Sequence, residues 1–197
     1  MGKEIEAKFI NIDKDLTIKK LNDIGAVKVF DERLLRRYVY NLPTVKNSTW
    51  IRVRDEVDKT TMTYKRIIEK SLDGVEEVEL VIDNFDNGRD FLKSIGLIEK
   101  AYQETKRLRY TIENGNVEFD IDTWPALEPY IEIEASSKEQ VKKYAKLLGF
   151  DWNTAMFGSS DFVYEKMYKV DADWISNKCP ILKFDKLPIE LQKNNLR

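Results

Sequence analysis

The chain has 197 residues, of which 42% are hydrophobic and 35% are charged, with 33 Lys and Arg against 35 Asp and Glu. This length suits one domain or one domain with an appendage, and the hydrophobic content is sufficient for a packed core. The net charge of -2 argues against a general nucleic-acid or membrane-surface binder, although charge can still segregate locally.

The chain has no histidine and a single cysteine, Cys179. The lack of histidine removes the usual general base and the commonest transition-metal ligand. Carboxylates remain, and they suit hard cations such as Mg²⁺ or Mn²⁺. One cysteine excludes an intramolecular disulfide. Because there is also no apolar leader and no run long enough to cross a bilayer, we expect a cytoplasmic protein.

Hydrophobic periodicity predicts an alternation of strands and helices. In chain order we expect a strand at 3–10, a helix at 14–24, strands at 27–41, 50–57, 60–69 and 75–82, a helix at 84–95, strands at 97–112, 116–124 and 129–136, and a helix at 137–148. Each predicted helix ends at a glycine followed by an apolar residue, which is typical of a Schellman stop. The pattern changes after residue 150, where short helices are expected near 159–169 and 171–177 before a tail.

Several of the predicted strands carry a charge on every second residue, which places those charges on one face. The acids of this set are Glu4, Glu6, Glu77, Glu79, Asp120, Asp122, Glu132 and Glu134, and the bases are Lys8, Arg52, Arg54, Lys65, Arg107 and Arg109. Taken singly, each charged strand face also fits a face exposed to solvent. Taken together and in chain order, these charged faces indicate a site for a metal and a polyanion.

The segment around Asn114-Gly115 predicts a hairpin with a two-residue loop, and such a loop fixes the register of the two strands. Arg109 is then opposite Asp120, and Arg107 is opposite Asp122. The other face of the same hairpin pairs apolar residues. Opposite charges on one face and apolar pairs on the other are both favourable across strands.

The charged face can meet water in a simple sheet, or it can line a closed barrel whose apolar face is covered by helices. Eight acids and six bases cannot share a dry core, because unpaired buried charge is too costly. They can line a water-filled tunnel, where guanidinium groups match phosphate oxygens and carboxylates hold divalent ions. Lys106 and Arg66 occupy the positions that alternate with these inward charges along their strands, so we expect them on the outer face.

The ordered set Glu4-x-Glu6-x-Lys8, Arg52-x-Arg54, Lys65, a basic strand, an Asp strand and Glu132-x-Glu134 resembles the CYTH superfamily, whose members are also called triphosphate tunnel metalloenzymes. The superfamily includes class IV adenylate cyclases, thiamine triphosphatases, inorganic triphosphatases and fungal RNA triphosphatases. The resemblance runs from residue 4 to about 150. There is one departure from the family pattern. The family often has Lys-x-Arg on the strand before the hairpin, whereas this chain has Thr105-Lys106-Arg107, so its lysine is shifted by one position.

The resemblance implies an α+β fold with a closed eight-stranded antiparallel β-barrel and flanking helices. It implies a tunnel domain over 1–150, and we expect 151–197 to be a helical appendage packed on the barrel. It implies triphosphate binding by Lys8, Arg52, Arg54, Lys65, Arg107 and Arg109. It implies that Mg²⁺ or Mn²⁺ is organised by Glu4, Glu6, Asp120, Asp122, Glu132 and Glu134, with Glu77 and Glu79 as further candidates.

Three functions follow as alternatives. The first is a metal-dependent triphosphatase acting on inorganic, nucleoside or thiamine triphosphate, with Glu4, Glu6 and Lys8 as the catalytic group. The second is an adenylate cyclase on the same scaffold, and the third is a non-catalytic binder of polyphosphate or nucleotide. The expected partner is a small-molecule triphosphate, with no membrane and no nucleic acid. A homodimer stays open as an alternative to a monomer.

Overall fold

The computed structural model describes residues 2–42 and 49–192. Its strands are β1 (Gly2–Glu4), β2 (Glu6–Phe9), β3 (Val27–Asn41), β4 (Thr49–Asp55), β5 (Thr60–Ile67), β6 (Val75–Ile82), β7 (Ile98–Ile112), β8 (Val117–Thr123), β9 (Tyr130–Ala135) and β10 (Ile181–Leu182). Its α-helices are α1 (Lys14–Asp23), α2 (Phe85–Ser94), α3 (Lys138–Leu147), α4 (Asp161–Tyr168) and α5 (Ile189–Gln192). Short helical segments are η1 (Glu113–Gly115), η2 (Trp152–Thr154) and the π-helical η3 (Trp174–Lys178).

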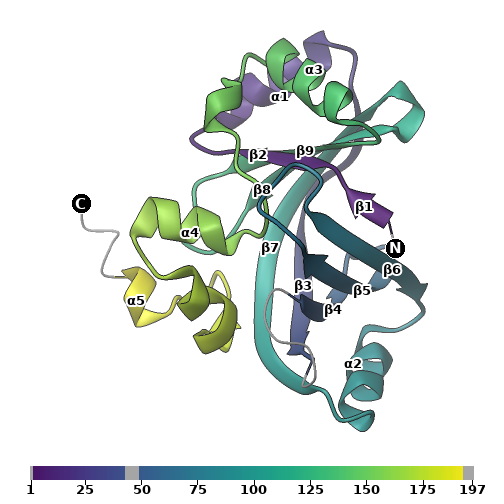
Figure 1. Cartoon of the computed structure of the whole chain (residues 1–197), viewed down its shortest axis with the longest axis vertical. Coiled ribbons are helices and arrows are strands. Elements are labelled where there is room, and N and C mark those ends of the chain that lie inside the picture. Colours follow the sequence, from purple (N-terminus) through teal and green to yellow (C-terminus); the bar gives the residue numbers. More distant parts are fainter. Residues whose placement is uncertain (1, 43–48, 193–197) are drawn as a thin grey trace.

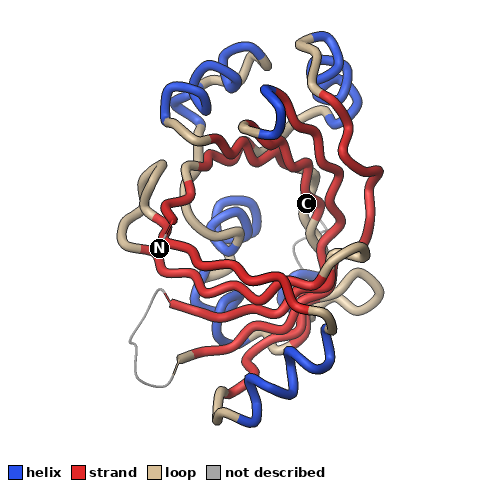
Figure 2. Tube along the Cα trace, turned by 90° about the vertical axis from the view of Figure 1, so that its right-hand side faces the viewer, coloured by secondary structure: helices blue, strands red, loops and turns tan. Residues whose placement is uncertain are grey.

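The strands form one sheet rolled into a nearly closed barrel, with the order β1-β6-β5-β4-β3-β7-β8-β9-β2 (Figure 1). Neighbours along this path are antiparallel, and the view along the barrel shows the strands as a ring (Figure 2). The predicted antiparallel barrel with flanking helices is therefore confirmed.

A break in the N-terminal strand closes the ring. β1 pairs with β6, whereas β2 pairs with β9 at the other end of the path. At the break, Ala135 N donates a hydrogen bond to Ile5 O at 3.1 Å, and Glu6 N donates to Leu72 O at 3.1 Å. The ring thus has nine strands where the sequence predicts eight, because the break at Ile5 divides the first predicted strand.

The three predicted helices form where a polar cap begins them and a glycine follows them. Asp13 accepts a hydrogen bond from Leu16 N at 2.9 Å and so caps the start of α1. The glycines that follow α1, α2 and α3 have positive φ, a region that favours glycine. These residues are Gly25 at 82°, Gly96 at 88° and Gly149 at 77°.

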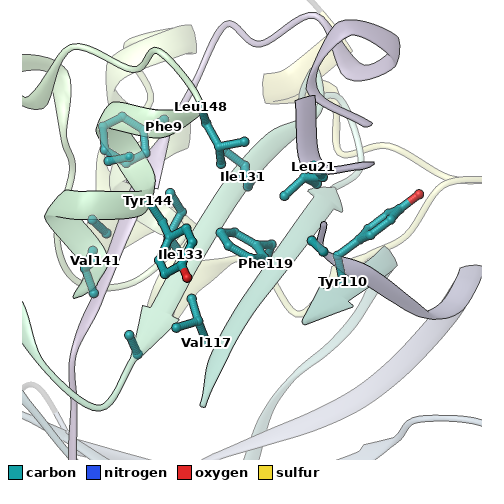
Figure 3. Packing of buried hydrophobic residues seen from close by; sticks show 14 of the residues in the cluster. Phe9, Leu21, Tyr110, Val117, Phe119, Ile131, Ile133, Val141, Tyr144 and Leu148 are labelled. Carbon is teal, nitrogen blue, oxygen red and sulfur yellow. The ribbon is translucent and has the colours of Figure 1, made fainter. Parts of the chain in front are cut away.

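The main hydrophobic core lies outside the barrel, between the sheet and helices α1 and α3 (Figure 3). Phe119 of β8 and Ile133 of β9 are fully buried there, and the ring of Tyr144 from α3 meets Phe119 edge-on at 5.5 Å. Since successive side chains of a strand point to opposite faces, the charged residues between these apolar ones point into the barrel. A smaller cluster under α2 covers β4 in the same way.

The β7–β8 hairpin has the predicted register. Arg107 pairs with Asp122, and Arg109 pairs with Asp120. The loop differs from the prediction, because residues 113–116 separate the paired ends Ile112 and Val117. The predicted two-residue loop is thus a four-residue loop built on η1, and the register is unchanged because both loops share the same centre.

The segment after residue 150 packs against the barrel. Lys8 and Met156 exchange two backbone hydrogen bonds of 2.9 Å, and β10 pairs in parallel with β7. A second hydrophobic cluster joins Trp124 and Tyr130 of the barrel region to Tyr164 of α4. The short helices expected near 159–169 and 171–177 correspond to α4 and η3. Within the described ranges, no helix has both the length and the hydropathy needed to cross a membrane.

Candidate functional site

A cavity of about 860 Å³ lies inside the barrel, and charged side chains from nearly every strand line it. The predicted set of inward charges lines this cavity with one exception, Asp120. Lys106 instead lies over the ring of Phe184 at 4.8 Å, and Arg66 is exposed outside the cavity. The period-two pattern therefore separates tunnel charges from outer charges as expected.

Three glutamates gather at one wall. Carboxylate oxygens of Glu4, Glu6 and Glu134 all lie within 4.8 Å of one another, and Glu6 stands directly opposite Glu134 in the β2–β9 register. Glu4 Oε2 is buried and has no hydrogen-bond partner among the described residues. Burial, followed by the charges of Glu6 and Glu4, raises the pKa of Glu134 to about 8. We call these three residues the acidic triad.

The acidic triad fits a divalent metal ion. Like charges facing each other across strands are destabilising, and a buried carboxylate oxygen without a partner is costly. A cation at the triad offsets both costs, and carboxylate oxygens are the ligands that hard cations such as Mg²⁺ and Mn²⁺ prefer. The donor set, and the lack of a partner for Glu4 Oε2 among the described residues, thus fit a divalent cation.

The other carboxylates that the sequence predicts as metal ligands form ion pairs with basic side chains. Arg107 binds Asp122 through Nε at 2.7 Å and Nη2 at 2.6 Å, and its Nη1 reaches Asp120 at 2.5 Å. Arg109 binds Asp120 through Nε and Nη2, each at 2.7 Å. Glu132 contacts Arg107 at 3.1 Å. In the part of the chain that the structure describes, these carboxylates are not grouped with the acidic triad.

Lys8 and Lys65 stand between acids. Lys8 Nζ lies 2.5 Å from Glu6 and 3.3 Å from Glu132. Burial would lower the pKa of Lys8, but Glu132 and Glu6 hold it above its usual value, so the ammonium stays charged. Lys65 Nζ donates to Glu4 and lies 2.7 Å from Glu77. Both lysines therefore place positive charge beside the acidic triad.

A basic wall is formed by Arg37 of β3 with Arg52 and Arg54 of β4. Arg37 stands directly opposite Arg54 in the strand register, a like-charge pair that needs an anion nearby. Arg37 Nε donates to Gln103 Oε1 at 2.8 Å, and the guanidinium lies 4.4 Å from the centre of the Trp124 ring. Burial and the neighbouring arginines lower the pKa of Arg37 to about 9.

The order of strands around the ring sets the basic wall across the tunnel from the acidic triad. The triad is carried by β1, β2 and β9, which adjoin one another at the closure. β3 stands at the middle of that path, furthest from the closure, and β4 is next to it. A phosphate chain between the two walls can therefore touch a metal on one side and guanidinium groups on the other.

The sequence reasoning missed several residues of the cavity lining, among them Arg37 and Glu56. Glu56 is 3% exposed and accepts hydrogen bonds from Arg54 Nε at 2.9 Å and from Nη2 at 2.5 Å. Its position two residues after Arg54 continues the same stripe, so the spacing carried a signal. Arg37 follows Arg36, and only the register with Arg54 shows which of the two points inward.

Glu56→Gln provides a pH test of this pairing. Burial opposes ionisation of Glu56, but the charge and hydrogen bonds of Arg54 lower its pKa to about 2. A carboxyl group whose pKa is lower in the folded protein than in the unfolded chain stabilises the fold at pH values above its unfolded pKa. This stabilisation is lost as the pH falls toward the folded pKa. Glu56→Gln is therefore expected to destabilise the protein at pH 7, and the difference from wild type should shrink between about pH 4.5 and pH 2. Urea unfolding across this range measures it, and a pH-independent difference would contradict the pairing.

One of the comparisons with known proteins identifies a family. A family model of the CYTH domain matches residues 2–159. None of the curated proteins compared with this chain matches it. The PH1012 protein from Pyrococcus horikoshii OT3 is 24% identical with a TM-score of 0.64, over 77% of this chain and 93% of that chain.

Two further solved structures share the fold at lower identity. A candidate adenylate cyclase from Vibrio parahaemolyticus has a TM-score of 0.70 at 13% identity, over 83% of this chain and 98% of that chain. A candidate adenylyl cyclase from Hippeastrum, for which a dominant triphosphatase activity is described, has a TM-score of 0.54 at 19% identity, over 83% and 95%. These likenesses show the fold, and the family match covers most of the chain, so the protein belongs to the CYTH domain family.

Proposed function

We propose that this protein hydrolyses a triphosphate inside the tunnel, with Mg²⁺ or Mn²⁺ as cofactor. The observation that carries the proposal is the acidic triad facing a wall of arginines within one cavity. A site for anions alone gains nothing from clustered carboxylates, and a site for metal alone gains nothing from opposed arginines. Phosphoryl transfer needs both, because its catalysis is mostly positioning and charge stabilisation.

In this mechanism Arg52 and Arg54 hold the phosphate oxygens by hydrogen bonds from their guanidinium groups. Lys8 and Lys65 neutralise charge beside the acidic triad. Arg107 and Arg109 add positive charge along the tunnel, although their guanidinium groups also bind Asp120 and Asp122. These six bases are the proposed triphosphate ligands.

When bound at the acidic triad, the metal ion would supply Lewis-acid stabilisation of phosphate charge and a lowered pKa for a ligated water. The carboxylate of Glu4 or Glu6 positions the attacking water and accepts its proton. The water oxygen forms a bond to the terminal phosphorus while the bond to the bridging oxygen breaks, and the diphosphate product keeps that electron pair. No histidine is needed for any of these steps.

An adenylate cyclase is the second candidate, since a cavity of about 860 Å³ falls in the range of about 300–1,000 Å³ typical of sites for larger organic ligands. Incubation with ATP and Mn²⁺ separates the two reactions. We expect ADP and phosphate, because no adenine-reading motif is visible in the sequence. Cyclic AMP and pyrophosphate would instead establish the cyclase, and chromatography of the products distinguishes them.

A non-catalytic binder of polyphosphate or nucleotide is the third candidate. Tight tripolyphosphate binding without a metal requirement and without turnover would favour it. We further propose a cytoplasmic protein that acts on a small molecule and binds neither membrane nor nucleic acid. The buried free thiol of Cys179 is in keeping with a reducing compartment.

A further inference from the structure

One arginine of the cavity, Arg37, has no carboxylate partner among the residues that the structure describes. It donates a hydrogen bond to an amide and lies over an aromatic ring, and both of these groups are neutral. Every other arginine of the cavity lining lies within 3.6 Å of at least one carboxylate oxygen. These other arginines are Arg52, Arg54, Arg107 and Arg109. Arg37 therefore carries a positive charge that no described acid balances by direct contact.

The side chain of Arg37 is nevertheless held in one orientation. Its Nε donates to Gln103 Oε1 at 2.8 Å, and the centre of its guanidinium group lies 4.4 Å from the centre of the Trp124 ring. Gln103 is 5% exposed and Trp124 is 4% exposed, so both supports are packed inside the protein. An amide and an aromatic ring can orient a guanidinium group without neutralising it. The position of Arg37 is thus fixed while its charge is kept.

The two terminal nitrogens of Arg37 remain available to a ligand. Nη1 and Nη2 have no hydrogen-bond partner among the described residues, because the hydrogen bond of this side chain is made by Nε. Neither nitrogen is among the buried polar atoms without a partner, so both keep accessible surface, and Arg37 lines the cavity. The planar fork of a guanidinium group matches two oxygens of one phosphoryl group. Arg37 therefore offers such a fork to the interior of the tunnel.

The charges around Arg37 are also positive. Arg37 stands opposite Arg54 in the register of β3 and β4. Burial, followed by the charges of Arg52 and Arg54, lowers the pKa of Arg37 to about 9, and Arg107 acts in the same direction. The guanidinium group is still charged at pH 7, because this pKa lies above that pH. Like charges gathered in a partly buried site are costly, and a bound anion offsets this cost.

We propose that Arg37 binds phosphoryl oxygens of the triphosphate directly, through Nη1 and Nη2, and that the substrate balances its charge in place of a carboxylate of the chain. Arg37 is then a further binding residue, beyond the six bases named above as triphosphate ligands. Arg107 and Arg109 share their guanidinium groups with aspartates, whereas Arg37 binds an anion without leaving an acid unpaired. The inference rests on the proposed function, since it assumes that the tunnel holds a triphosphate.

The test measures the binding of tripolyphosphate by calorimetry in EDTA, where the divalent metal is removed and turnover does not interfere. Arg37→Gln should weaken binding about tenfold or more, the effect of one charge-assisted hydrogen bond. Its affinity should also fall less steeply than that of wild type as NaCl is added, because one contact between charges is missing. Arg37→Lys keeps the charge and loses the fork, so its affinity should lie between those of wild type and Arg37→Gln.

Arg36→Gln is the matched control. Arg36 is the preceding residue of β3, pairs with Asp55 on the outside of the barrel, and does not line the cavity. The substitution changes the net charge by the same amount as Arg37→Gln, so it should leave the affinity and its salt dependence unchanged. Urea unfolding without ligand checks that each variant is folded. If Arg37→Gln does not fold, Arg37→Lys decides, since wild-type affinity in that variant would overturn the contact through the fork.

A folded Arg37→Gln variant that binds tripolyphosphate as tightly as wild type would overturn the assignment of Arg37 and leave the proposed hydrolysis intact. An equal loss in Arg36→Gln, or a wild type that binds no tripolyphosphate, would overturn the assignment as well. Phosphate release under Mg²⁺ or Mn²⁺ tests the proposed function separately. A selective loss of binding in Arg37→Gln, with no phosphate release by wild type from any triphosphate, would contradict hydrolysis and support the role of Arg37.

Discussion

Glu6→Gln is expected to reduce phosphate release from tripolyphosphate at least about 100-fold while leaving the protein folded. Glu6 belongs to the acidic triad and faces Glu134 across two paired strands. The substitution removes a proposed metal ligand, so the rise in melting temperature that we expect Mg²⁺ to cause in wild type should largely disappear in the variant. Without metal, the substitution has two opposing effects on stability, because it relieves the like-charge pair with Glu134 and removes a charged partner of Lys8.

Glu4→Gln should behave in the same way, since Glu4 Oε2 is the triad oxygen that lacks a hydrogen-bond partner among the described residues. Phosphate release and melting temperature, each measured with and without Mg²⁺, check both variants. Glu128→Gln is the control, because Glu128 is exposed and lies outside the cavity lining. Normal hydrolysis of tripolyphosphate by Glu4→Gln or Glu6→Gln would contradict the assignment of the triad.

Arg107→Ala and Arg52→Ala are expected to fail in different ways. Arg107 is 9% exposed and contacts the carboxylates of Asp120, Asp122 and Glu132, so its removal leaves buried negative charge without a partner. Breaking a buried ion pair in this way costs about 3–5 kcal/mol of unfolding free energy. The main expected effect of Arg107→Ala is therefore a large loss of stability.

Arg52→Ala should change stability much less. Arg52 hydrogen-bonds Thr63 at 3.3 Å and lies 3.6 Å from Glu79, but it also stands among other arginines of the basic wall. Losing its charge-assisted contact to a phosphate should weaken tripolyphosphate binding by about 1.5–3 kcal/mol, or roughly 10-fold to 150-fold.

Urea unfolding and calorimetric titration with tripolyphosphate measure the two effects separately. Arg66→Ala serves as the control, since Arg66 is exposed and does not line the cavity. Wild-type affinity in Arg52→Ala would argue against the basic wall as the phosphate site. Wild-type stability in Arg107→Ala would show that the buried carboxylates do not depend on this arginine.

The barrel could be predicted from the sequence because successive side chains of a strand point to opposite faces, which gives the sequence a period of two residues. Apolar residues such as Phe119 and Ile133 alternate with charged ones, and this alternation determines which side chains face the tunnel. Lys106 was assigned to the outer face for the same reason, and the structure places it against Phe184. The hairpin register was also accessible, since opposite charges and apolar pairs agree on a single alignment.

The sequence did not show that the inward carboxylates divide into the acidic triad and a second set that pairs with basic side chains. The sequence assigns Asp120, Asp122 and Glu132 to the metal along with Glu4, Glu6 and Glu134, but only the last three gather around one point among the described residues. Period two shows that a residue faces inward, and it does not show the residue's height along the tunnel or its neighbour across it. That information comes from the stagger between strands, which closure of the ring determines.

What the sequence by itself determined is the class of molecule: a barrel with an ionic interior, ordered motifs of a known family, and acids and bases enough for a metal and a polyanion. The tertiary structure alone decided which charges pair and which are left uncompensated, and it brought Arg37 and Asp161 into the same cavity. The physical reason is that facing direction is a local property of the chain. Proximity across the tunnel depends instead on contacts between residues that are far apart in the sequence.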